Sequence, residues 1–405
     1  METSYITIPK GFKASGVCAD LKGEGKLDFA LIYSETPATV SGVYTSNLVK
    51  GHSLQRSIKL IDNKLPKRAI AINAKNANAC VGPVGEEDAD QIAKAIAKEL
   101  DIDSSEVLTA STGVIGIRLP VEKMVSHVPN LVSSLSSDEA SAHNAELAMM
   151  TTDTVPKEVS AKITLQNGKE ISVAAMAKGS GMIHPNLATM ICVFTTDAKI
   201  DKSLLDDMLK KAVSHTFNRV SVDGDTSVCD SVMVFANGAS EVEIVKDTED
   251  ADIFYSTLEQ LSTDLARMIA CDGEGATKLL TCKVSGAKTE KDAKGVAKSV
   301  ICSSLLKAAM FGADANWGRV LCAIGYSGCD VDVQKVDVSF ASAAGKIDVC
   351  KNGAGIDFSE ETAKTILTED EIDILVYLND GEGYAESYGC DLTYEYVKIN
   401  GDYRT

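Results

Sequence analysis

The most informative stretch of the chain reads Lys178-Gly179-Ser180-Gly181-Met182-Ile183-His184-Pro185-Asn186-Leu187-Ala188-Thr189-Met190, followed at once by Ile191-Cys192-Val193-Phe194. Its first part is rich in Gly and small polar residues, which is typical of a flexible loop. Its second part is an apolar run with strand-forming residues, and it predicts a buried strand. The loop therefore delivers Thr189 to the start of a strand. Taken alone, the pattern also fits an ordinary strand entry, because Thr is a good strand former.

A second informative segment is Ser111-Thr112-Gly113-Val114-Ile115-Gly116. A hydroxyl beside a glycine offers one side-chain donor and one accessible backbone N–H. Two such donors suit the negatively charged oxygen that develops during acyl transfer, an arrangement called an oxyanion hole. Thr112 and Gly113 are candidates for that role, although the same residues also suit a simple turn.

Apolar periodicity elsewhere predicts amphipathic helices, and short apolar runs between them predict strands. The predicted helices cover 86–100, 203–217, 253–271 and, after the capping residue Ser359, 360–367. The predicted strands cover 29–33, 163–165, 191–194, 232–236 and 372–378. This mixture predicts an α/β or α+β fold with several sheets.

The length of 405 residues allows two or three domains. A polar, charged stretch at 286–295 separates the apolar run 279–284 from a further predicted helix at 299–311. We therefore expect a domain boundary near this stretch. The expected division is a main domain at 1–283, a smaller C-terminal α/β domain at 284–395 and a tail at 396–405.

The composition, with 45% hydrophobic and 24% charged residues, is ordinary for a globular protein. A net charge of −18 argues against a nucleic-acid partner, because phosphate binding needs clustered Lys and Arg. No apolar run approaches the length of a membrane span, and the polar N-terminus lacks the features of a secretory signal. The eleven Cys include no C-x-x-C pair and predict buried free thiols. We therefore expect a cytoplasmic protein with neither nucleic-acid nor membrane partners.

Two motifs resemble ligand loops but fail on spacing. The run 273–278 lacks the G-x-x-x-x-G-K-[ST] spacing of a phosphate loop. The run 223–227 begins like a calcium loop but lacks the Gly and the closing Glu that such a loop needs. With only five His and no H-x-x-x-H pair, we expect no metal site and no bound cofactor.

Together, the two segments resemble the ornithine acetyltransferase family, also called the bifunctional glutamate N-acetyltransferases of arginine biosynthesis. Further stretches resemble that family in the same order along the chain. They are IPKGF at 8–12, GVYTSN at 42–47, NANAC at 76–80, DGDTS at 223–227, DGEGATK at 272–278, GADANWGR at 312–319 and YVKINGDYRT at 396–405. Because the resemblance spans nearly the whole chain, it is far more specific than any single motif.

The resemblance implies a multi-layer α/β sandwich that is similar to, but topologically distinct from, the N-terminal-nucleophile hydrolases. It also implies a precursor that cleaves itself between Ala188 and Thr189, with the cleaved pairs assembling as an α2β2 heterotetramer. The Thr189 hydroxyl would attack the Ala188 carbonyl, and hydrolysis of the resulting ester would free the Thr189 α-amine. An α-amine has an unperturbed pKa of roughly 7.7–8.0, so it can act as the base for its own hydroxyl.

The same resemblance implies the reaction and the roles of the site residues. Thr189 would take the acetyl group from N-acetylornithine and pass it to glutamate in a ping-pong reaction, with Thr112 and Gly113 as the oxyanion pair. Lys178 would meet a substrate carboxylate and Glu274 a substrate amine. The implied substrate contacts are Thr152, Lys178, Thr189, Glu274, Asn400 and Thr405, the last two on a tail that returns to the active site.

Two questions stay open at this level. The use of acetyl-CoA as a second acetyl donor varies within the family, and no residue of this chain decides it. The alternative function is a self-cleaving N-terminal-nucleophile amidase or aminopeptidase, in which water accepts the acyl group.

The chain departs from the family pattern at two places. Lys75 stands where Gly or another small residue is expected, and a left-handed backbone there would strain a lysine. Val228-Cys229 stands where the family more often has Thr-Asn, which puts a polar role at those positions in doubt.

Overall fold

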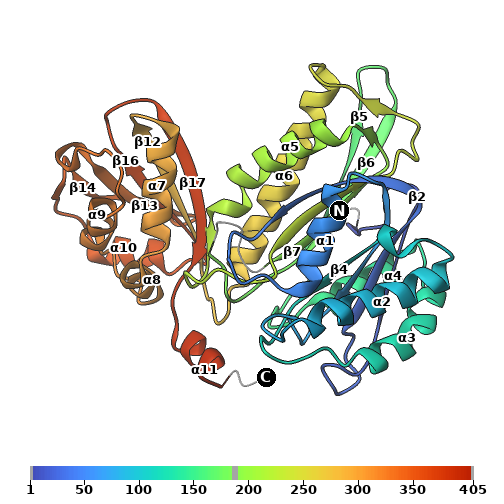
Figure 1. The fold of residues 1–405 in the computed structure, drawn as a ribbon. Coiled ribbons are helices and arrows are strands. Elements are labelled where there is room, and N and C mark those ends of the chain that lie inside the picture. The colour runs from blue at the N-terminus through green and yellow to red at the C-terminus, as the bar shows by residue number, and fades with distance from the viewer. Residues whose placement is uncertain (1–2, 185–189, 403–405) are drawn as a thin grey trace.

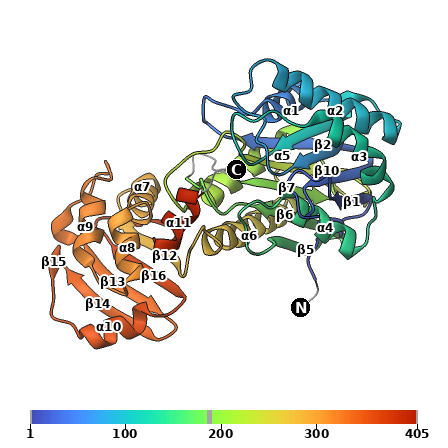
Figure 2. The ribbon, with the colours of Figure 1, turned by 90° about the horizontal axis from the view of Figure 1, so that it is seen from below.

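The computed structural model describes residues 3–184 and 190–402 of the chain. It contains two large β-sheets, each covered by its own helices (Figure 1). The first sheet belongs to a larger N-terminal part and the second to a smaller C-terminal part. Figure 2 shows the same two parts from below, with the C-terminal helix α11 between them.

The first sheet has eight strands in the order β4-β3-β2-β10-β7-β6-β5, and β1 pairs with β2 outside this path. The pairs β3–β4 and β7–β10 are parallel, and the other neighbours are antiparallel. The strands are β1 (Phe12–Val17), β2 (Phe29–Tyr44), β3 (Lys67–Asn73), β4 (Val107–Ser111), β5 (Glu158–Thr164), β6 (Glu170–Lys178), β7 (Ile191–Thr196) and β10 (Ser231–Ala236).

Helices cover both faces of this sheet. Cys192 and Phe194 of β7 belong to the core that includes α5 and α6, whereas Ile191 and Val193 belong to the core that includes α4. Because both faces are covered, β7 is apolar at consecutive positions rather than at alternate ones. The helices of this part are α1 (His52–Asp62), α2 (Val84–Leu100), α3 (Val121–Ser133), α4 (Glu139–Met149), α5 (Lys202–His215) and α6 (Glu249–Cys271).

The second sheet has seven strands in the order β15-β14-β13-β16-β12-β17-β9. Its edge strand β9 (Val220–Ser221) comes from the larger part and pairs with β17, so the two parts share backbone hydrogen bonds. The other strands are β12 (Leu279–Ala287), β13 (Asp337–Ser342), β14 (Gly345–Lys351), β15 (Ala354–Gly355), β16 (Glu371–Tyr377) and β17 (Gly383–Cys390), and the helices are α7 (Glu290–Ile301), α8 (Ser304–Phe311), α9 (Trp317–Gly325) and α10 (Glu360–Leu367). A two-stranded ribbon joins β8 (Lys199–Ile200) to β11 (Glu243–Ile244), and short 3-10 turns lie at Ser104–Glu106, Phe217–Arg219 and Val333–Lys335.

The expected fold class, mixed α/β with several sheets, is confirmed. The helix expected at 360–367 is α10, and the Ser359 hydroxyl caps it by accepting the Thr362 N–H at 3.2 Å. The single helix expected at 299–311 is wrong. The chain forms two helices there because Ser303 caps a new one, α8, by accepting the Leu306 N–H at 3.3 Å.

The domain boundary expected between 283 and 284 falls inside β12, which belongs entirely to the second sheet. The polar stretch 286–295 is therefore no linker. It contains the end of β12 and the first turns of α7, which begins where the Thr289 hydroxyl accepts the Asp292 N–H at 3.1 Å.

The chain leaves β17 and returns to the larger part through α11 (Tyr394–Asp402) (Figure 1). The Thr393 hydroxyl anchors the start of this helix by donating to the Gly275 carbonyl at 2.7 Å. Asn400 on α11 reaches Glu274, as described below. Thr405, the last expected substrate contact, lies outside the described residues.

No helix within residues 3–184 and 190–402 is long and apolar enough to cross a membrane. All eleven cysteines carry free thiols, but the expectation that they are buried holds for only some of them. Cys80, Cys271 and Cys322 are exposed.

Candidate active site

Six of the residues expected at the site line one cavity of 110 Å³. They come from five regions of the chain that the fold brings together. The lining residues are Thr112, Gly113, Ile115, Thr151, Thr152, Lys178, Gly181, Met182, Ser227, Val228, Cys229, Glu274 and Asn400. The expected nucleophile Thr189 and its neighbour Ala188 lie outside the described residues.

One wall of the cavity is the turn that follows β4. The Thr112 N–H donates to the Asn73 carbonyl at 3.0 Å, which holds the turn at the end of the parallel pair β3–β4. Gly113 has φ +126°, and a Cβ on it would lie 2.1 Å from the Lys75 carbonyl oxygen. Only glycine fits at this position. Neither the Thr112 hydroxyl nor the Gly113 N–H has a hydrogen-bond partner within the described part of the chain, so both are available to a ligand.

Lys75 has φ 82°, so its backbone is left-handed, the conformation in which a lysine is strained. This conformation is costly for a lysine. It turns the Lys75 carbonyl toward the Val114 N–H, which donates to it at 2.8 Å. The strained residue thus supports the turn that carries Gly113.

A second wall carries a positive charge. Lys178 ends β6, and the residue is 2% exposed. Its ammonium lies 3.7 Å from the Asp153 carboxylate. Thr152, beside Asp153, is half-buried and lines the same wall. This wall can bind a substrate carboxylate, since it presents an ammonium with a hydroxyl nearby.

The opposite charge comes from Glu274, which is 8% exposed. Its Oε2 accepts the Asn400 Nδ2–H at 2.8 Å, which links α11 to the cavity. Gly181 passes so close that a Cβ there would lie 2.2 Å from the Glu274 Cδ. The cavity therefore holds both an ammonium and a carboxylate, as an amino-acid ligand requires.

On both sides of 185–189, described residues bind carboxylates to which the sequence analysis gave no role. Before it, the Met182 and Ile183 N–H groups donate to the Asp223 carboxylate at 2.6 and 2.9 Å. After it, the Met190 N–H donates to Asp230 Oδ1 at 3.1 Å. Burial raises the pKa of Asp223, and it raises that of Asp230 further. The run 223–227 lacks the spacing of a calcium loop, but its Asp223 anchors the backbone at Met182 and Ile183.

The departure at Val228-Cys229 makes one wall apolar. Both residues are buried, and they form a small cluster with Ala77 and Ala79. Burial raises the pKa of the Cys229 thiol, which therefore stays neutral. These positions offer apolar contact to a ligand where the family pattern would offer polar side chains.

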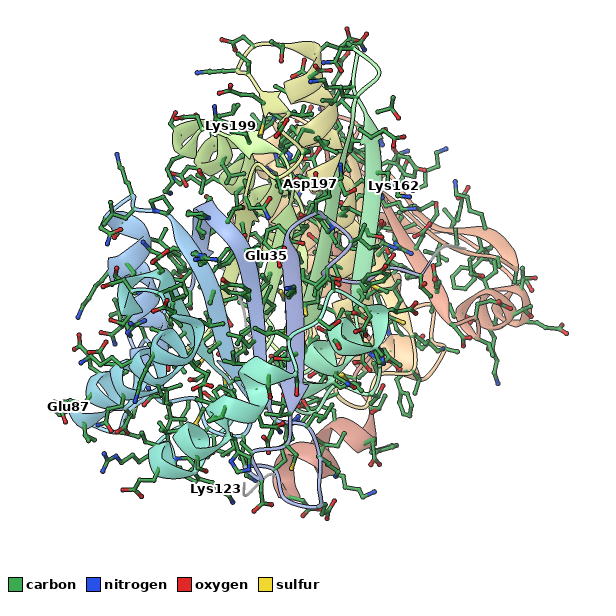
Figure 3. The ribbon with its side chains drawn as sticks, turned by 90° about the vertical axis from the view of Figure 1, so that its right-hand side faces the viewer. Glu35, Glu87, Lys123, Lys162, Asp197 and Lys199 are labelled. Atoms are coloured by element: carbon green, nitrogen blue, oxygen red, sulfur yellow. The ribbon has the colours of Figure 1, made fainter. Side chains whose placement is uncertain are left out.

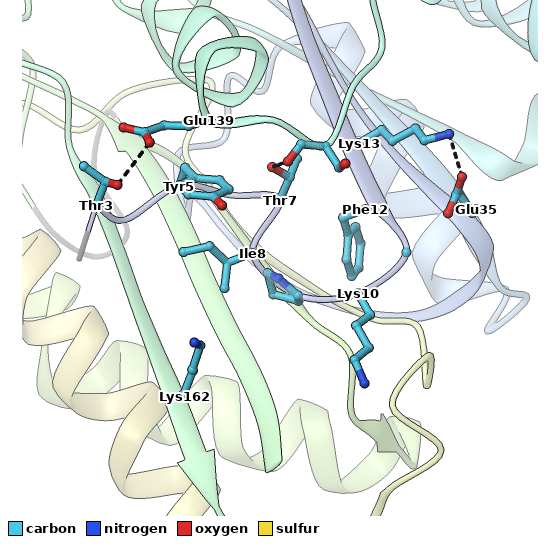
Figure 4. Close-up of a pocket in the computed structure, with 13 residues that line it drawn as sticks. Thr3, Tyr5, Thr7, Ile8, Lys10, Phe12, Lys13, Glu35, Glu139 and Lys162 are labelled. Carbon is cyan, nitrogen blue, oxygen red and sulfur yellow. Dashed lines mark hydrogen bonds and ion pairs between the residues drawn. The ribbon is translucent and has the colours of Figure 1, made fainter.

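A larger cavity of 670 Å³ lies elsewhere, along the N-terminal segment (Figure 4). Three charged side chains of its lining already have partners: Lys13 pairs with Glu35 at 2.6 Å, and Glu139 accepts the Thr3 hydroxyl at 3.1 Å. None of the expected site residues that the structure describes lines it. The smaller cavity is therefore the better candidate for the active site.

Comparison with known proteins gives a consistent result. The ArgJ family model matches residues 13–405. The arginine biosynthesis bifunctional protein ArgJ of Caldanaerobacter subterraneus subsp. tengcongensis is 49% identical over 99% of this chain and 98% of its own length. The arginine biosynthesis bifunctional protein ArgJ 1 of Clostridium acetobutylicum is 47% identical over 100% of this chain and 98% of its own.

Solved structures also match. The crystal structure of the arginine biosynthesis bifunctional protein argJ from Bacillus halodurans is 45% identical, covers 52% of this chain and 97% of that chain, and has a TM-score of 0.49. The ornithine acetyltransferase from Mycobacterium tuberculosis, complexed with ornithine, is 33% identical, covers 47% of this chain and 98% of that chain, and has a TM-score of 0.42.

Proposed function

Because the chain belongs to the ArgJ family and is thus an acetyl-transfer enzyme of arginine biosynthesis, we propose that it moves acetyl from N-acetylornithine to glutamate through an ester on Thr189. The observation that carries the proposal is the composition of the small cavity. It joins a buried ammonium, Lys178, and a buried carboxylate, Glu274, to the donors of Thr112 and Gly113. Neither donor has a partner among the described residues. An N-acetylated diamino acid offers a carbonyl, a carboxylate and an amine to match them.

The first proposed step is self-cleavage. The Thr189 hydroxyl attacks the Ala188 carbonyl, the acyl group moves from nitrogen to oxygen, and water hydrolyses the ester. One chain then ends at Ala188, and the other begins at Thr189 with a free α-amine. Hydrogen bonds to Asp223 and Asp230 hold the described chain on both sides of this segment, at Ile183 and Met190.

The second proposed step is acetyl transfer. The Thr189 α-amine takes the hydroxyl proton, and the oxygen attacks the amide carbon of N-acetylornithine. The Thr112 hydroxyl and the Gly113 N–H donate to the oxyanion, the C–N bond breaks, and ornithine leaves with the proton. Glutamate then attacks the acetyl ester through its amine and regenerates the Thr189 hydroxyl.

The proposed substrate contacts follow the charges of the cavity. Lys178 binds the substrate carboxylate, with the Thr152 hydroxyl beside it. Glu274 binds the amine of the ornithine side chain, and Asn400 orients the Glu274 carboxylate. Thr405, by resemblance to the family, completes these contacts.

We also propose that acetyl-CoA serves as a second acetyl donor and that no other cofactor takes part. The support is that the relatives cited above are named bifunctional proteins. A steady-state assay with acetyl-CoA and glutamate tests this. If wild-type protein releases CoA no faster than the Thr189→Ala variant does, the enzyme does not use acetyl-CoA as a donor.

We propose further that the cleaved chains assemble as a cytoplasmic α2β2 heterotetramer. The resemblance to the family supports this assembly. Light scattering of the cleaved protein should give twice the mass of one precursor chain, and a mass equal to one precursor would contradict the proposal.

The main test combines processing and chemistry. Purified protein should run as two fragments, and the second should begin with Thr189 by N-terminal sequencing. The Thr189→Ala variant should stay a single chain and transfer no acetyl. If Thr189→Ala still splits at the same bond, the proposed nucleophile is wrong. Release of acetate in place of N-acetylglutamate would favour the amidase alternative, which the names of the relatives do not support.

A further inference from the structure

A cluster of charged side chains lies directly behind the carboxylate-binding wall of the cavity. The Lys157 Nζ contacts Asp153 Oδ1 at 2.9 Å and Asp272 Oδ2 at 2.6 Å. The side chains of Lys157 and Asp153 are fully buried, and that of Asp272 is 5% exposed. Lys178 joins the cluster through Asp153 at 3.7 Å. Two carboxylates and two ammonium groups thus share one buried volume.

Buried ions are costly unless each is paired and hydrogen-bonded. Burial by itself lowers the pKa of Lys157, but the carboxylates of Asp153 and Asp272 outweigh it and raise that pKa above its ordinary value. Burial raises the pKa of Asp153, but Lys178 and Lys157 together hold it well below its ordinary range. Both shifts favour the charged forms of Lys157 and Asp153.

The two carboxylates of the cluster, Asp153 and Asp272, also hold backbone segments beside the cavity. The Asp153 carboxylate accepts the Thr151 N–H at 2.9 Å and the Gly179 N–H at 2.6 Å. These bonds fix the loop of Thr151 and Thr152 against the residue that follows Lys178.

Asp272 holds the third segment. Its carboxylate accepts the Thr154 N–H and hydroxyl, and its carbonyl accepts the Ser180 hydroxyl at 2.7 Å. The Glu274 N–H, two residues on, donates to the Ser180 carbonyl at 3.1 Å. The cluster thus links the two charged walls of the cavity to each other.

The two lysines of the cluster lie at different distances from Asp153. Asp153 lies nearer to Lys157, at 2.9 Å, than to Lys178, at 3.7 Å. Lys157 therefore takes the close contact with Asp153, whereas Lys178 lies farther from the same carboxylate. Among the described residues the Lys178 ammonium has no closer ion pair than this one, so it can make a shorter contact with a substrate carboxylate.

We propose that Asp153, Lys157 and Asp272 are positioning residues, which hold the Lys178 ammonium at the distance and orientation that select substrates with a carboxylate. This inference rests on the proposed function and names a specificity device for the same site. The three residues do not touch the substrate. They act through Lys178 and through the backbone of 151–154 and 179–180.

The test compares two acetyl donors that differ only in the carboxylate, namely N-acetylornithine and N-acetylputrescine. In Asp153→Asn, kcat/KM for N-acetylornithine should fall on the order of tenfold or more, mainly through KM, because a hydrogen-bonded charge near Lys178 is lost. The kcat/KM for N-acetylputrescine, or its inhibition constant if it acts as a competitive inhibitor, should be unchanged because this compound has no carboxylate for Lys178. General damage to the fold would weaken both donors alike, so an unchanged ratio of the two would overturn the proposal.

Asp197→Asn is the matched control. Asp197 is also a buried Asp that accepts backbone N–H groups, from Lys10 and Ser172, but it lies at the far end of β7, away from α11 (Figure 3). Its variant should keep the wild-type ratio.

Two further measurements keep the outcome clear. If Asp153→Asn does not fold, Thr154→Val decides, because it removes only the hydroxyl that bonds Asp272 from an exposed residue. Thr154→Val should lower kcat/KM for N-acetylornithine relative to that for N-acetylputrescine, by a smaller factor than Asp153→Asn does. A wild-type ratio of the two values would refute the proposal. Wild-type protein that transfers no acetyl would instead refute the proposed function.

Discussion

Replacing Gly113 with Ala tests the predicted oxyanion turn directly. A Cβ on Gly113 would lie 2.1 Å from the Lys75 carbonyl oxygen, so that oxygen must move by about 1 Å. The new residue would also keep φ +126°, and a conformation of this kind costs about 1–3 kcal/mol. Moving the carbonyl disturbs its 2.8 Å bond to the Val114 N–H, and an unmade buried hydrogen bond costs about 1–3 kcal/mol. Together the expected destabilisation is about 2–6 kcal/mol.

The same change should displace the Gly113 N–H from the cavity. Losing one oxyanion donor typically lowers kcat by about 10²–10³-fold. The assay is acetyl transfer from N-acetylornithine to glutamate, with kcat expressed per mole of cleaved protein, beside a thermal melt. Thr112→Val is the companion variant, since it removes the hydroxyl without backbone strain and should lower kcat with little change in Tm. A Gly113→Ala variant with wild-type kcat would refute the oxyanion assignment, and one with a wild-type Tm would refute the steric reasoning.

Three further outcomes are expected. Gly181→Ala should fold, because its Cβ meets only the end of the flexible Glu274 side chain, but it should raise KM for N-acetylornithine about tenfold or more; an unchanged KM would contradict the role of Glu274. Burial raises the pKa of Glu146 well above its ordinary value, so its contribution to stability is present below the unfolded pKa of about 4.3 and is lost as pH rises. Since Gln does not titrate, the Tm of Glu146→Gln minus that of wild type should increase from about pH 5 to pH 9, and a constant difference would count against this account. Iodoacetamide should label the exposed Cys80 and leave the buried, neutral Cys229 unlabelled in folded protein, as peptide mass analysis can show.

Local signals predicted much of the fold. The helix at 360–367 follows from the Ser359 cap and from apolar spacing within a few residues. The strand at 191–194 follows from its continuous apolar run, because a strand covered on both faces needs no polar side. The same rules failed at 299–311, where apolar spacing continues across a cap at Ser303 that divides the segment into two helices.

The domain boundary could not be found locally. Whether β12 belongs to the first or the second sheet depends on its pairing with β16 and β17, which lie about a hundred residues further along the chain. A polar stretch such as 286–295 has the composition of a linker, yet here it caps and begins a helix.

The sequence by itself determined which residues are candidates for the chemistry, because each motif lies within a short continuous segment of the chain. It indicated Thr112, Gly113, Lys178 and Glu274, and it marked Lys75 as a place where the backbone conformation matters. Only the tertiary structure decided that these residues share one cavity. It alone showed that Lys157 pairs with a carboxylate 115 positions away, Asp272. The physical reason is that a buried charge is tolerable only beside its partner, and the partner is supplied by the packing of the chain rather than by its order.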